Sequence, residues 1–267
     1  MTLELLISCM NQTDMKLAEK ISAQTPVLLI NQTSCSALQE GKRNGHAVRM
    51  ISTTERGISR SRNMAIQNAV GDICLFCDDD EWLFHDYPQI ILNAFKRLAD
   101  ADIIIFNLES HECRLRKTEH LLKFLELLKV SSVQIAFRRE AVLNANILFD
   151  PLMGAGSGNG AQEENKFLME CYQHGLKIYY VPQIIGQLEE NGSTWFQGYD
   201  ERFFYQRGVA TRELLGLPLS IFYAVYYVVK KRKLYSSEIS SAIALYSTFR
   251  GCIKNDIHRQ RRPEKLP

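Results

Sequence analysis

Two aspartates, Asp78 and Asp80, follow directly after an apolar run and are separated by one residue. Side chains at that spacing share one face of an extended chain, and in a turn they can converge on one point. Carboxylate oxygens are the ligands that Mg²⁺ and Mn²⁺ prefer, and substrate phosphates usually complete the shell of Mg²⁺. The pair therefore predicts a divalent cation, Mn²⁺ or Mg²⁺, bound together with a diphosphate. The alternative is an acidic turn that caps the next helix.

Asp79 and Glu81 complete a run of four acids, which repel one another unless cations or hydrogen-bond donors offset their charge. We expect these two residues to make local turn, capping or secondary contacts. Upstream, Arg56, Arg60 and Arg62 stand at the start of a predicted helix, where guanidinium and backbone N–H groups favour anions. They would suit a diphosphate; the alternative is a solvated face.

A CxxC pair, Cys74 and Cys77, lies in the apolar run before the acids. Residues three apart in a strand point to opposite faces, and no second pair has zinc-site spacing. We therefore expect both thiols to pack in the core. The seven cysteines are an odd number, mostly in apolar surroundings, which fits a reducing compartment.

The elements that must position these residues alternate between short apolar runs and stretches of helical periodicity. That alternation predicts βα units around a mostly parallel sheet, in which ligands bind beyond the carboxyl ends of the strands. The predicted strands are 3–9, 27–31, 47–52, 73–77 and 103–107, and the predicted helices between them are 14–23, 59–70 and 87–99.

The second half of the chain is less regular and ends in helices rich in Tyr, Phe and Leu beyond residue 200. Before them we expect a helix at 119–128, a strand at 133–137, a glycine-rich loop at 154–161, a helix at 162–173 and a strand at 177–181 that Pro182 ends.

The stretch "ERGISRSRNMAIQNAVGDICLFCDDDEW" at 55–82 resembles the nucleotide-sugar-binding half of family 2 glycosyltransferases of the GT-A fold. The resemblance extends over roughly residues 1–195. It implies an α/β, Rossmann-like, mostly parallel central sheet flanked by helices, followed here by a helical C-terminal appendage. The matching residues are Gly57, Ser59, Arg62, Asn63, Gly71, Asp72, Asp78 and Asp80.

This resemblance also implies which residues hold the donor. Asp78 and Asp80 would bind the metal, and the nucleotide-sugar contacts would come from Asn31, Glu55, Arg62, Asp78 and Asp79. Asn31 stands where the family usually has an acidic residue that contacts the nucleobase and ribose. An amide would therefore make the base contact.

A second carboxylate pair, Glu163 and Glu164, matches the family's segment in which a carboxylate deprotonates the acceptor hydroxyl. Glu164 matches the usual Asp. The alternative is that both merely complement the positive end of a helix, which is worth about 0.3–1 kcal/mol each. Gln187 stands where relatives often have His, so no third protein ligand is assigned. Trp195 could stack on a sugar ring or pack in the core.

The function implied is a metal-dependent, inverting glycosyltransferase that uses a UDP-sugar donor and a glycan or lipid-linked acceptor in bacterial surface-polysaccharide assembly. Nucleic acid is not an expected partner. One alternative is a phosphotransferase with Asp78 as nucleophile, although Trp82 stands where that class needs Thr or Val. Another is a non-catalytic, membrane-associated assembly protein with a vestigial sugar-nucleotide site.

The predicted division places a catalytic domain at 1–200, with a donor half at 1–110 and an acceptor half at 111–200, and a basic helical region at 201–267. From Leu217 to Val229 the chain is nearly continuously apolar, and four basic residues follow. The run is too short to span a bilayer, so we expect an interfacial helix at the inner face of the plasma membrane. The alternatives are packing on the protein or on a second copy in a homodimer. The N-terminal apolar run is short and carries Glu4, so we expect a cytoplasmic chain without a signal peptide.

Overall fold

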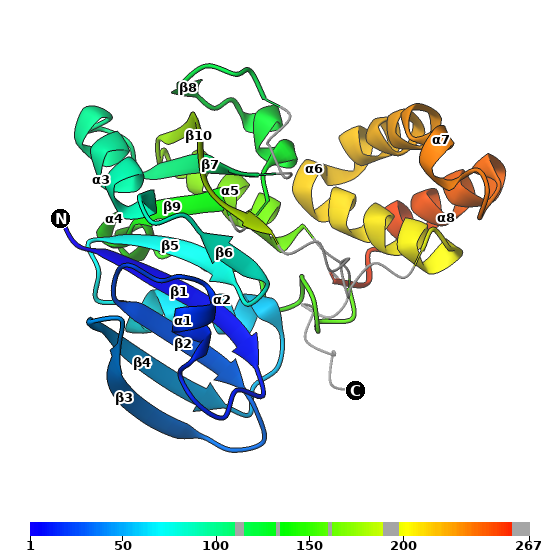
Figure 1. Cartoon of the computed structure of the whole chain (residues 1–267). Helices are drawn as coiled ribbons and strands as arrows, with labels where there is room; N and C mark the ends of the chain where they lie inside the picture. Colours follow the sequence, from blue (N-terminus) through cyan, green and yellow to red (C-terminus); the bar gives the residue numbers. More distant parts are fainter. Residues whose placement is uncertain (110–114, 132–133, 160–161, 189–197, 258–267) are drawn as a thin grey trace, which may run out of the picture. The chain divides into compact units, whose positions relative to one another are not determined.

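The computed structural model shows an α/β fold built on one mixed sheet, and it describes residues 1–109, 115–131, 134–159, 162–188 and 198–257 (Figure 1). The chain forms two compact units, each described by itself below. The first unit comprises Met1–Phe149 and Phe167–Gly192, and the second comprises Asp150–Lys166 and Ser193–Pro267. The predicted domain boundary at residue 200 stays a prediction.

The sheet of the first unit has the strand order β3-β4-β2-β1-β5-β9-β7-β10-β6, and β8 pairs with β10. Strands β4, β2, β1 and β5 run parallel, and β9 lies antiparallel between β5 and β7. The strands are β1 (Leu3–Met10), β2 (Val27–Gln32), β3 (Ala37–Arg43), β4 (His46–Thr53), β5 (Ile73–Asp78), β6 (Glu81–Leu83), β7 (Ile103–Glu109), β8 (His120–Leu121), β9 (Ile135–Arg138) and β10 (Ile178–Leu188). The predicted α/β class with a mostly parallel sheet is confirmed.

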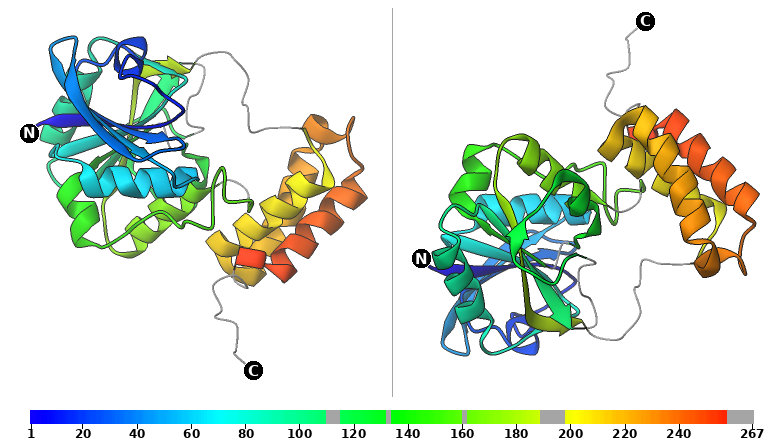
Figure 2. Two further views of the ribbon diagram at one scale, coloured as in Figure 1. Left: turned by 90° about the horizontal axis from the view of Figure 1, so that it is seen from below. Right: turned by 90° about the horizontal axis from the view of Figure 1, so that it is seen from above.

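Helices lie on both faces of the sheet (Figure 2). They are α1 (Leu17–Lys20), α2 (Ile58–Asn68), α3 (Tyr87–Arg97), the 3₁₀ helix η1 (Phe124–Lys129), α4 (Arg139–Asn144) and α5 (Glu163–Gln173), and the second unit adds α6 (Glu201–Lys230), α7 (Arg232–Tyr235) and α8 (Ser241–Lys254).

Alternation along β1 and β5 assigns their side chains to two different layers. Leu5 and Leu75 belong to the main apolar cluster, which also contains the buried residues of α1 and α3. On the opposite face, the Ser8 hydroxyl accepts a hydrogen bond from Ser61 of α2 at 2.8 Å. Phe76, on that face too, packs against Phe137, Phe149 and Phe167. The last residue of β5, Asp78, therefore faces α2.

Two predicted helices are wrong in extent. The helix predicted at 14–23 is only α1, because Asp14 accepts a hydrogen bond from the backbone N–H of Lys16 in a local turn and Ser22 has φ 60°. The helix predicted at 119–128 is instead β8 followed by η1. Pairing of β8 with β10 and the capping of η1 by Glu126, which accepts from the backbone N–H of Lys123, outweigh the helical pattern.

The strand predicted at 177–181 is also wrong in extent, because β10 continues past Pro182 to Leu188. The register between β10 and β7 shifts after Tyr180, and a proline is tolerated at such an irregularity because no ladder hydrogen bond is needed there. The structure also has β3, β6 and α4, which the sequence patterns do not predict.

In the second unit α6 is a helical hairpin rather than one rod. Gly216 has φ 71° and ψ 173°, which breaks the helix at a backbone conformation that favours glycine. The guanidinium of Arg207 lies 4.1 Å from the ring centroid of Tyr227, whereas a straight helix would separate them by about 30 Å. The two arms, 201–215 and 217–230, therefore run back along each other.

Close packing of α8 on the first arm depends on two glycines. A Cβ at Gly208 would clash with the carbonyl oxygen of Thr248, and one at Gly251 would clash with that of Tyr205. Among the described residues α6 is long and apolar enough to cross a membrane by length and composition. Each arm of the hairpin, however, reaches only about 22 Å, which is less than the roughly 30 Å of a hydrocarbon core.

A buried carboxylate in β1 generates a prediction about stability. Glu4 is buried and accepts hydrogen bonds from Arg49 at 2.7 Å and from the backbone N–H groups of Val70 and Gly71 at 2.6 and 2.9 Å. Glu4→Leu leaves the Arg49 guanidinium without its carboxylate partner and two backbone N–H groups without their acceptor, so we expect a loss of about 3–5 kcal/mol in the free energy of unfolding measured with urea.

The matched control is Glu40→Leu, in the exposed strand β3 opposite the same arginine. That variant should stay within about 0.5 kcal/mol of the native chain. A Glu4→Leu variant as stable as the native chain would contradict the expectation.

Candidate functional site

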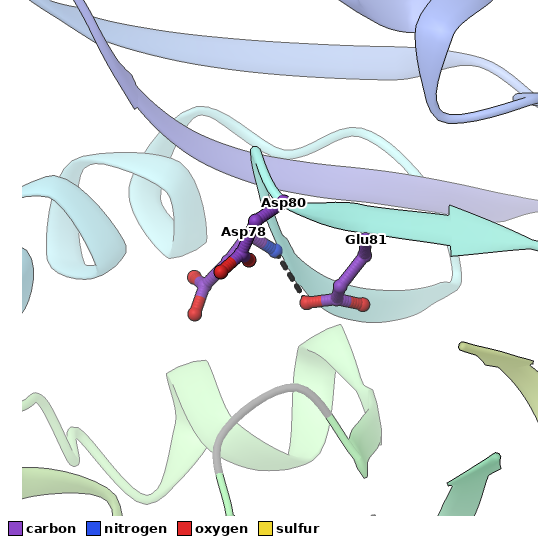
Figure 3. A group of neighbouring side chains, drawn as sticks. All are labelled: Asp78, Asp80 and Glu81. Atoms are coloured by element: carbon purple, nitrogen blue, oxygen red, sulfur yellow. Dashed lines mark hydrogen bonds between the residues drawn. The ribbon is translucent and has the colours of Figure 1, made fainter. Parts of the chain in front are cut away.

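Three carboxylates gather at the carboxyl end of β5, where the chain turns over two residues into β6. One side-chain oxygen from each of Asp78, Asp80 and Glu81 lies within 4.8 Å of the other two (Figure 3). Asp80 is exposed, Asp78 is half-buried and Glu81 is 1% exposed. The set thus runs from solvent into the protein, and the end of a strand next to a parallel neighbour is where ligands of such sheets bind.

Glu81 supports the turn from inside. Its Oε1 accepts a hydrogen bond from the backbone N–H of Asp78 at 2.6 Å, and its register partner across β6 and β10 is Leu188. Its Oε2 is buried and has no hydrogen-bond partner among the residues that the structure describes. Burial raises the pKa of Glu81 well above its usual range, and the charge of Asp78 raises it further.

The donor set fits a hard divalent cation. All three side chains offer oxygen, and a buried carboxylate oxygen without a partner is costly unless a cation or a donor meets it. Asp78 and Asp80, predicted as metal ligands, would hold the ion, and Glu81 joins them. The sequence predicts only a turn or secondary contact for Glu81, because the burial of this residue depends on the pairing of β6 with β10.

Arg62 of α2 already offsets part of this negative charge. Its Nη2 lies 3.2 Å from Oδ1 of Asp78, and its side chain is 3% exposed. The guanidinium also lies 6.0 and 5.6 Å from the ring centroids of Phe76 and Phe149, within the range of cation–π attraction. The arginine is therefore fixed in position beside the carboxylates, where a diphosphate would meet it. Arg56 and Arg60 are exposed.

Asn31, predicted to contact the nucleobase, is buried at the end of β2. Its amide oxygen accepts from the backbone N–H of Gln12 at 2.9 Å, and its amide nitrogen donates to the carbonyl of Gln12 at 2.8 Å and to the hydroxyl of Ser52 at 3.1 Å. These bonds tie the loop after β1 to the ends of β2 and β4. The Asn31 side chain thus holds this loop in place, and its base contact stays a prediction.

The other predicted donor contacts lie around the same sheet edge. Glu55 is exposed before α2, and its backbone N–H donates to the Thr53 hydroxyl at 3.1 Å. Asp79 is half-buried in the turn, and its carbonyl accepts from Lys20 at 3.4 Å. Gln32 holds the start of α2, because its side-chain oxygen accepts from the backbone N–H of Gly57 at 2.8 Å. No sequence pattern singled out Gln32.

Glu163 and Glu164 stand in the first turn of α5 and belong to the second unit. Glu163 is buried and Glu164 is half-buried. The structure therefore gathers Asp78, Asp80 and Glu81 in one unit and assigns this second predicted pair to the other.

A half-buried ion-pair network fastens the segment that carries Glu163 and Glu164 to the C-terminal helices. Lys166, also in the first turn of α5, lies 2.6 Å from Asp150 and 3.6 Å from Glu213 of α6, and Asn255 donates to Glu213 at 2.7 Å. Met153 of the same segment packs with Val209, Ala210 and Ile257. The chain beyond residue 200 thus holds the first turn of α5, which carries Glu163 and Glu164.

Gln187 and Trp195 are the remaining residues that the sequence places near the predicted site. Gln187 is half-buried in β10 and pairs with Trp82 of β6, so it lies beside the strand that carries Glu81. Trp195 lies outside the described residues.

Comparison with known proteins finds a family model that matches part of the chain. Residues 32–156 match the family model described as glycosyl transferase family 2. Asp78 and Asp80 lie inside this match, whereas Glu163 and Glu164 lie beyond its end. No curated protein sequence matches the chain significantly.

Solved glycosyltransferase structures share the fold at low sequence identity. The structure of S. aureus TarS 1–349 in complex with UDP-GlcNAc has a TM-score of 0.62 and 12% identity, over 100% of this chain and 94% of that chain. The mannosyltransferase PcManGT from Pyrobaculum calidifontis, in complex with GDP-Man and Mn²⁺, has a TM-score of 0.52 and 13% identity, over 97% and 88%. A longer S. aureus TarS structure has a TM-score of 0.58 and 12% identity, over 89% of this chain and 44% of that one.

These comparisons confirm the predicted resemblance to family 2 glycosyltransferases, the GT-A type of fold and the prediction of a transferase enzyme.

The carboxylate group generates a prediction about metal binding. Glu81→Gln keeps an acceptor for the Asp78 N–H and removes an acid whose ionisation is opposed by burial and by Asp78 in the folded chain but not in the unfolded one. At neutral pH the metal-free variant should therefore melt at a higher temperature than the native chain. Because the variant loses an anionic ligand, its affinity for Mn²⁺, measured by calorimetric titration, should fall at least about tenfold.

Glu40→Gln is the control, because it removes an exposed glutamate in β3. It should change neither quantity. An unchanged Mn²⁺ affinity in Glu81→Gln would exclude Glu81 from the metal site.

Proposed function

We propose that this chain transfers a sugar from a nucleotide-diphosphate donor to an acceptor hydroxyl, with a divalent cation held by Asp78, Asp80 and Glu81. The observation that carries the proposal is the carboxylate group with its unpartnered buried oxygen, next to a fixed arginine, at the carboxyl end of β5. The match of this segment to the glycosyltransferase family model supports it. A divalent cation bound there supplies positive charge to the leaving diphosphate.

Arg62 contributes the chain's own positive charge to the same place. Its guanidinium is held by the Asp78 carboxylate and by two aromatic rings, so little side-chain freedom is lost when it meets a phosphate. Charge that is already oriented stabilises a departing diphosphate without reorganisation. Arg62 therefore binds the donor and favours departure of the nucleotide.

Glu164 is the general base of the proposal. It accepts the proton of the acceptor hydroxyl while the hydroxyl oxygen attacks the anomeric carbon and the bond from that carbon to the diphosphate oxygen breaks, which inverts the configuration. Glu164 is the better base of the pair, because Glu163 is buried whereas Glu164 is half-buried and can reach a substrate. Both stand in the first turn of α5.

The proposal also includes a donor, an acceptor, a cellular location and a cation. We take a UDP-sugar as donor, supported by the UDP-GlcNAc complex of TarS, which shares the fold. The acceptor is a glycan or a lipid-linked glycan of bacterial surface-polysaccharide assembly, and the enzyme works at the inner face of the plasma membrane. Mn²⁺ is the first cation to test, because the mannosyltransferase of similar fold is bound to it.

Nucleotide binding tests the donor site. We expect UDP to bind in calorimetric titrations with Mn²⁺, and we expect its affinity to fall at least about tenfold when the metal is withheld or when Asp80 is changed to Asn. Asp86→Asn, an exposed aspartate before α3 whose side chain makes no cap hydrogen bond, is the control and should bind as the native chain does. Failure of UDP, GDP, CDP and TDP alike to bind would overturn the proposed function.

Catalysis tests the base. With a UDP-sugar panel, nucleotide release by transfer to the acceptor or slowly to water is the readout, and Glu164→Gln should lower it by about 10²- to 10⁴-fold while UDP affinity is kept. Glu170→Gln, a half-buried glutamate later in the same helix, serves as the control. Native turnover in Glu164→Gln would show that the base is a different group.

A further inference from the structure

The second arm of α6, residues 217–230, leaves a row of large apolar side chains in solvent. Phe222 is 74% exposed and Val229 is 71% exposed. Residues at this spacing fall on one side of a helix. We call the row the exposed stripe; its members are Leu219, Phe222, Val225, Tyr226 and Val229.

The opposite side of the same arm is apolar as well, and it packs inside the second unit. Ala224, Tyr227 and Val228 are buried, and Tyr227 and Val228 pack with Phe204 and Tyr235 inside the second unit. A helix needs only one apolar face to pack on its own unit. The exposed stripe is therefore additional to what the fold of this unit requires, and a contiguous exposed apolar patch marks an interaction surface.

A basic cluster stands at the end of the stripe and indicates the chemistry of the partner. It consists of Lys230, Lys231, Arg232 and Lys233, of which Lys231 is half-buried and the others are exposed. The nearest acid downstream in the sequence, Glu238, already accepts a hydrogen bond from the backbone N–H of Tyr199. Cations beside an apolar, aromatic-bearing helix face match a bilayer surface with anionic headgroups.

The hairpin at Gly216 determines how such an arm can meet a bilayer. Because the arm turns back on its partner, it cannot cross the hydrocarbon core, but it can lie along the surface with the stripe facing the acyl chains. Tyr226 in the stripe suits the interface, since its ring is apolar and its hydroxyl can stay in the headgroup layer.

We propose that the second arm of α6 and the basic cluster dock the protein on the surface of an anionic phospholipid bilayer. The site does not depend on the proposed transferase chemistry. It would bring a membrane-attached acceptor to the enzyme if that chemistry holds. A second copy of this chain fits the stripe less well, because nothing in the basic cluster complements itself.

Co-sedimentation of the full-length chain with vesicles tests the proposal. The native chain should bind phosphatidylcholine vesicles that contain phosphatidylglycerol much more tightly than vesicles of phosphatidylcholine alone. Phe222→Ser together with Val229→Ser should weaken binding to the mixed vesicles at least about tenfold, since it removes the apolar groups that would enter the bilayer. Both residues are exposed, so the fold should persist.

The matched control changes two exposed apolar residues of the first unit, Leu38→Ser and Val70→Ser, which are 64% and 65% exposed in the native chain. This variant should bind vesicles as the native chain does. Stripe and control variants that weaken binding equally would overturn the proposal.

A second variant tests the charges. Lys230→Gln, Arg232→Gln and Lys233→Gln together should lower affinity for the mixed vesicles by about fivefold per charge, about a hundredfold in all at low salt. Binding to neutral vesicles should not change.

The control for that variant removes the same net charge from exposed residues of the first unit, with Lys42→Gln, Lys96→Gln and Arg116→Gln. We expect it to keep most of the affinity. Equal losses in the two triple variants would show that net charge, not the cluster, drives binding, and would overturn the proposal.

Three outcomes separate the docking surface from the proposed transferase and from a dimer interface. If the native chain binds no vesicle but binds UDP with Mn²⁺, only the docking surface is wrong; vesicle binding without nucleotide binding would instead leave the docking surface and remove the proposed transferase. If sedimentation equilibrium shows a native dimer that the stripe variant turns into a monomer, the stripe belongs to a second copy and the proposal is overturned.

Discussion

Repulsion among carboxylates at the carboxyl end of β5 is the constraint on which the site depends. A two-residue turn places Asp78, Asp80 and Glu81 within reach of one ion, and the pairing of β6 with β10 buries the last of them. Glu81 cannot move away to relieve the repulsion, because its Oε1 holds the backbone of Asp78. The protein therefore keeps a concentrated negative charge that a cation, a proton or a guanidinium must offset.

Arg62 supplies a positive charge beside these carboxylates, and several contacts of α2 and its neighbours fix its position. The hydrogen bond from Gly57 to Gln32 fixes the start of α2 against the end of β2, and the Ser61–Ser8 hydrogen bond fixes the next turn against β1. Phe76 and Phe149 then pack beside the guanidinium. The two hydrogen bonds each join a strand to α2, so the position of Arg62 beside the carboxylates depends on the sheet.

Helix α6 of the second unit is apolar and long enough to cross a membrane, but it folds back on itself. Gly216 turns α6 back, and glycines at 208 and 251 let backbones of α6 and α8 approach closely. The half-buried network of Lys166, Asp150 and Glu213 then ties the first turn of α5 to these helices. The C-terminal helices thus have a part in holding the candidate base as well as an exposed face of their own.

The sequence by itself determined the α/β class, the central strands and the positions of the carboxylates, because apolar runs and adjacent acids are local patterns that report burial and turns directly. Only the tertiary structure decided which partners those elements have. Glu81 is buried beside Asp78 because β6 pairs with β10, where its register partner is Leu188. The Asn31 amide bonds to Gln12 and Ser52, and residues 120–121 pair with β10 instead of forming the predicted helix. Pairing across long stretches of chain depends on which surfaces meet, and that information lies in no single segment.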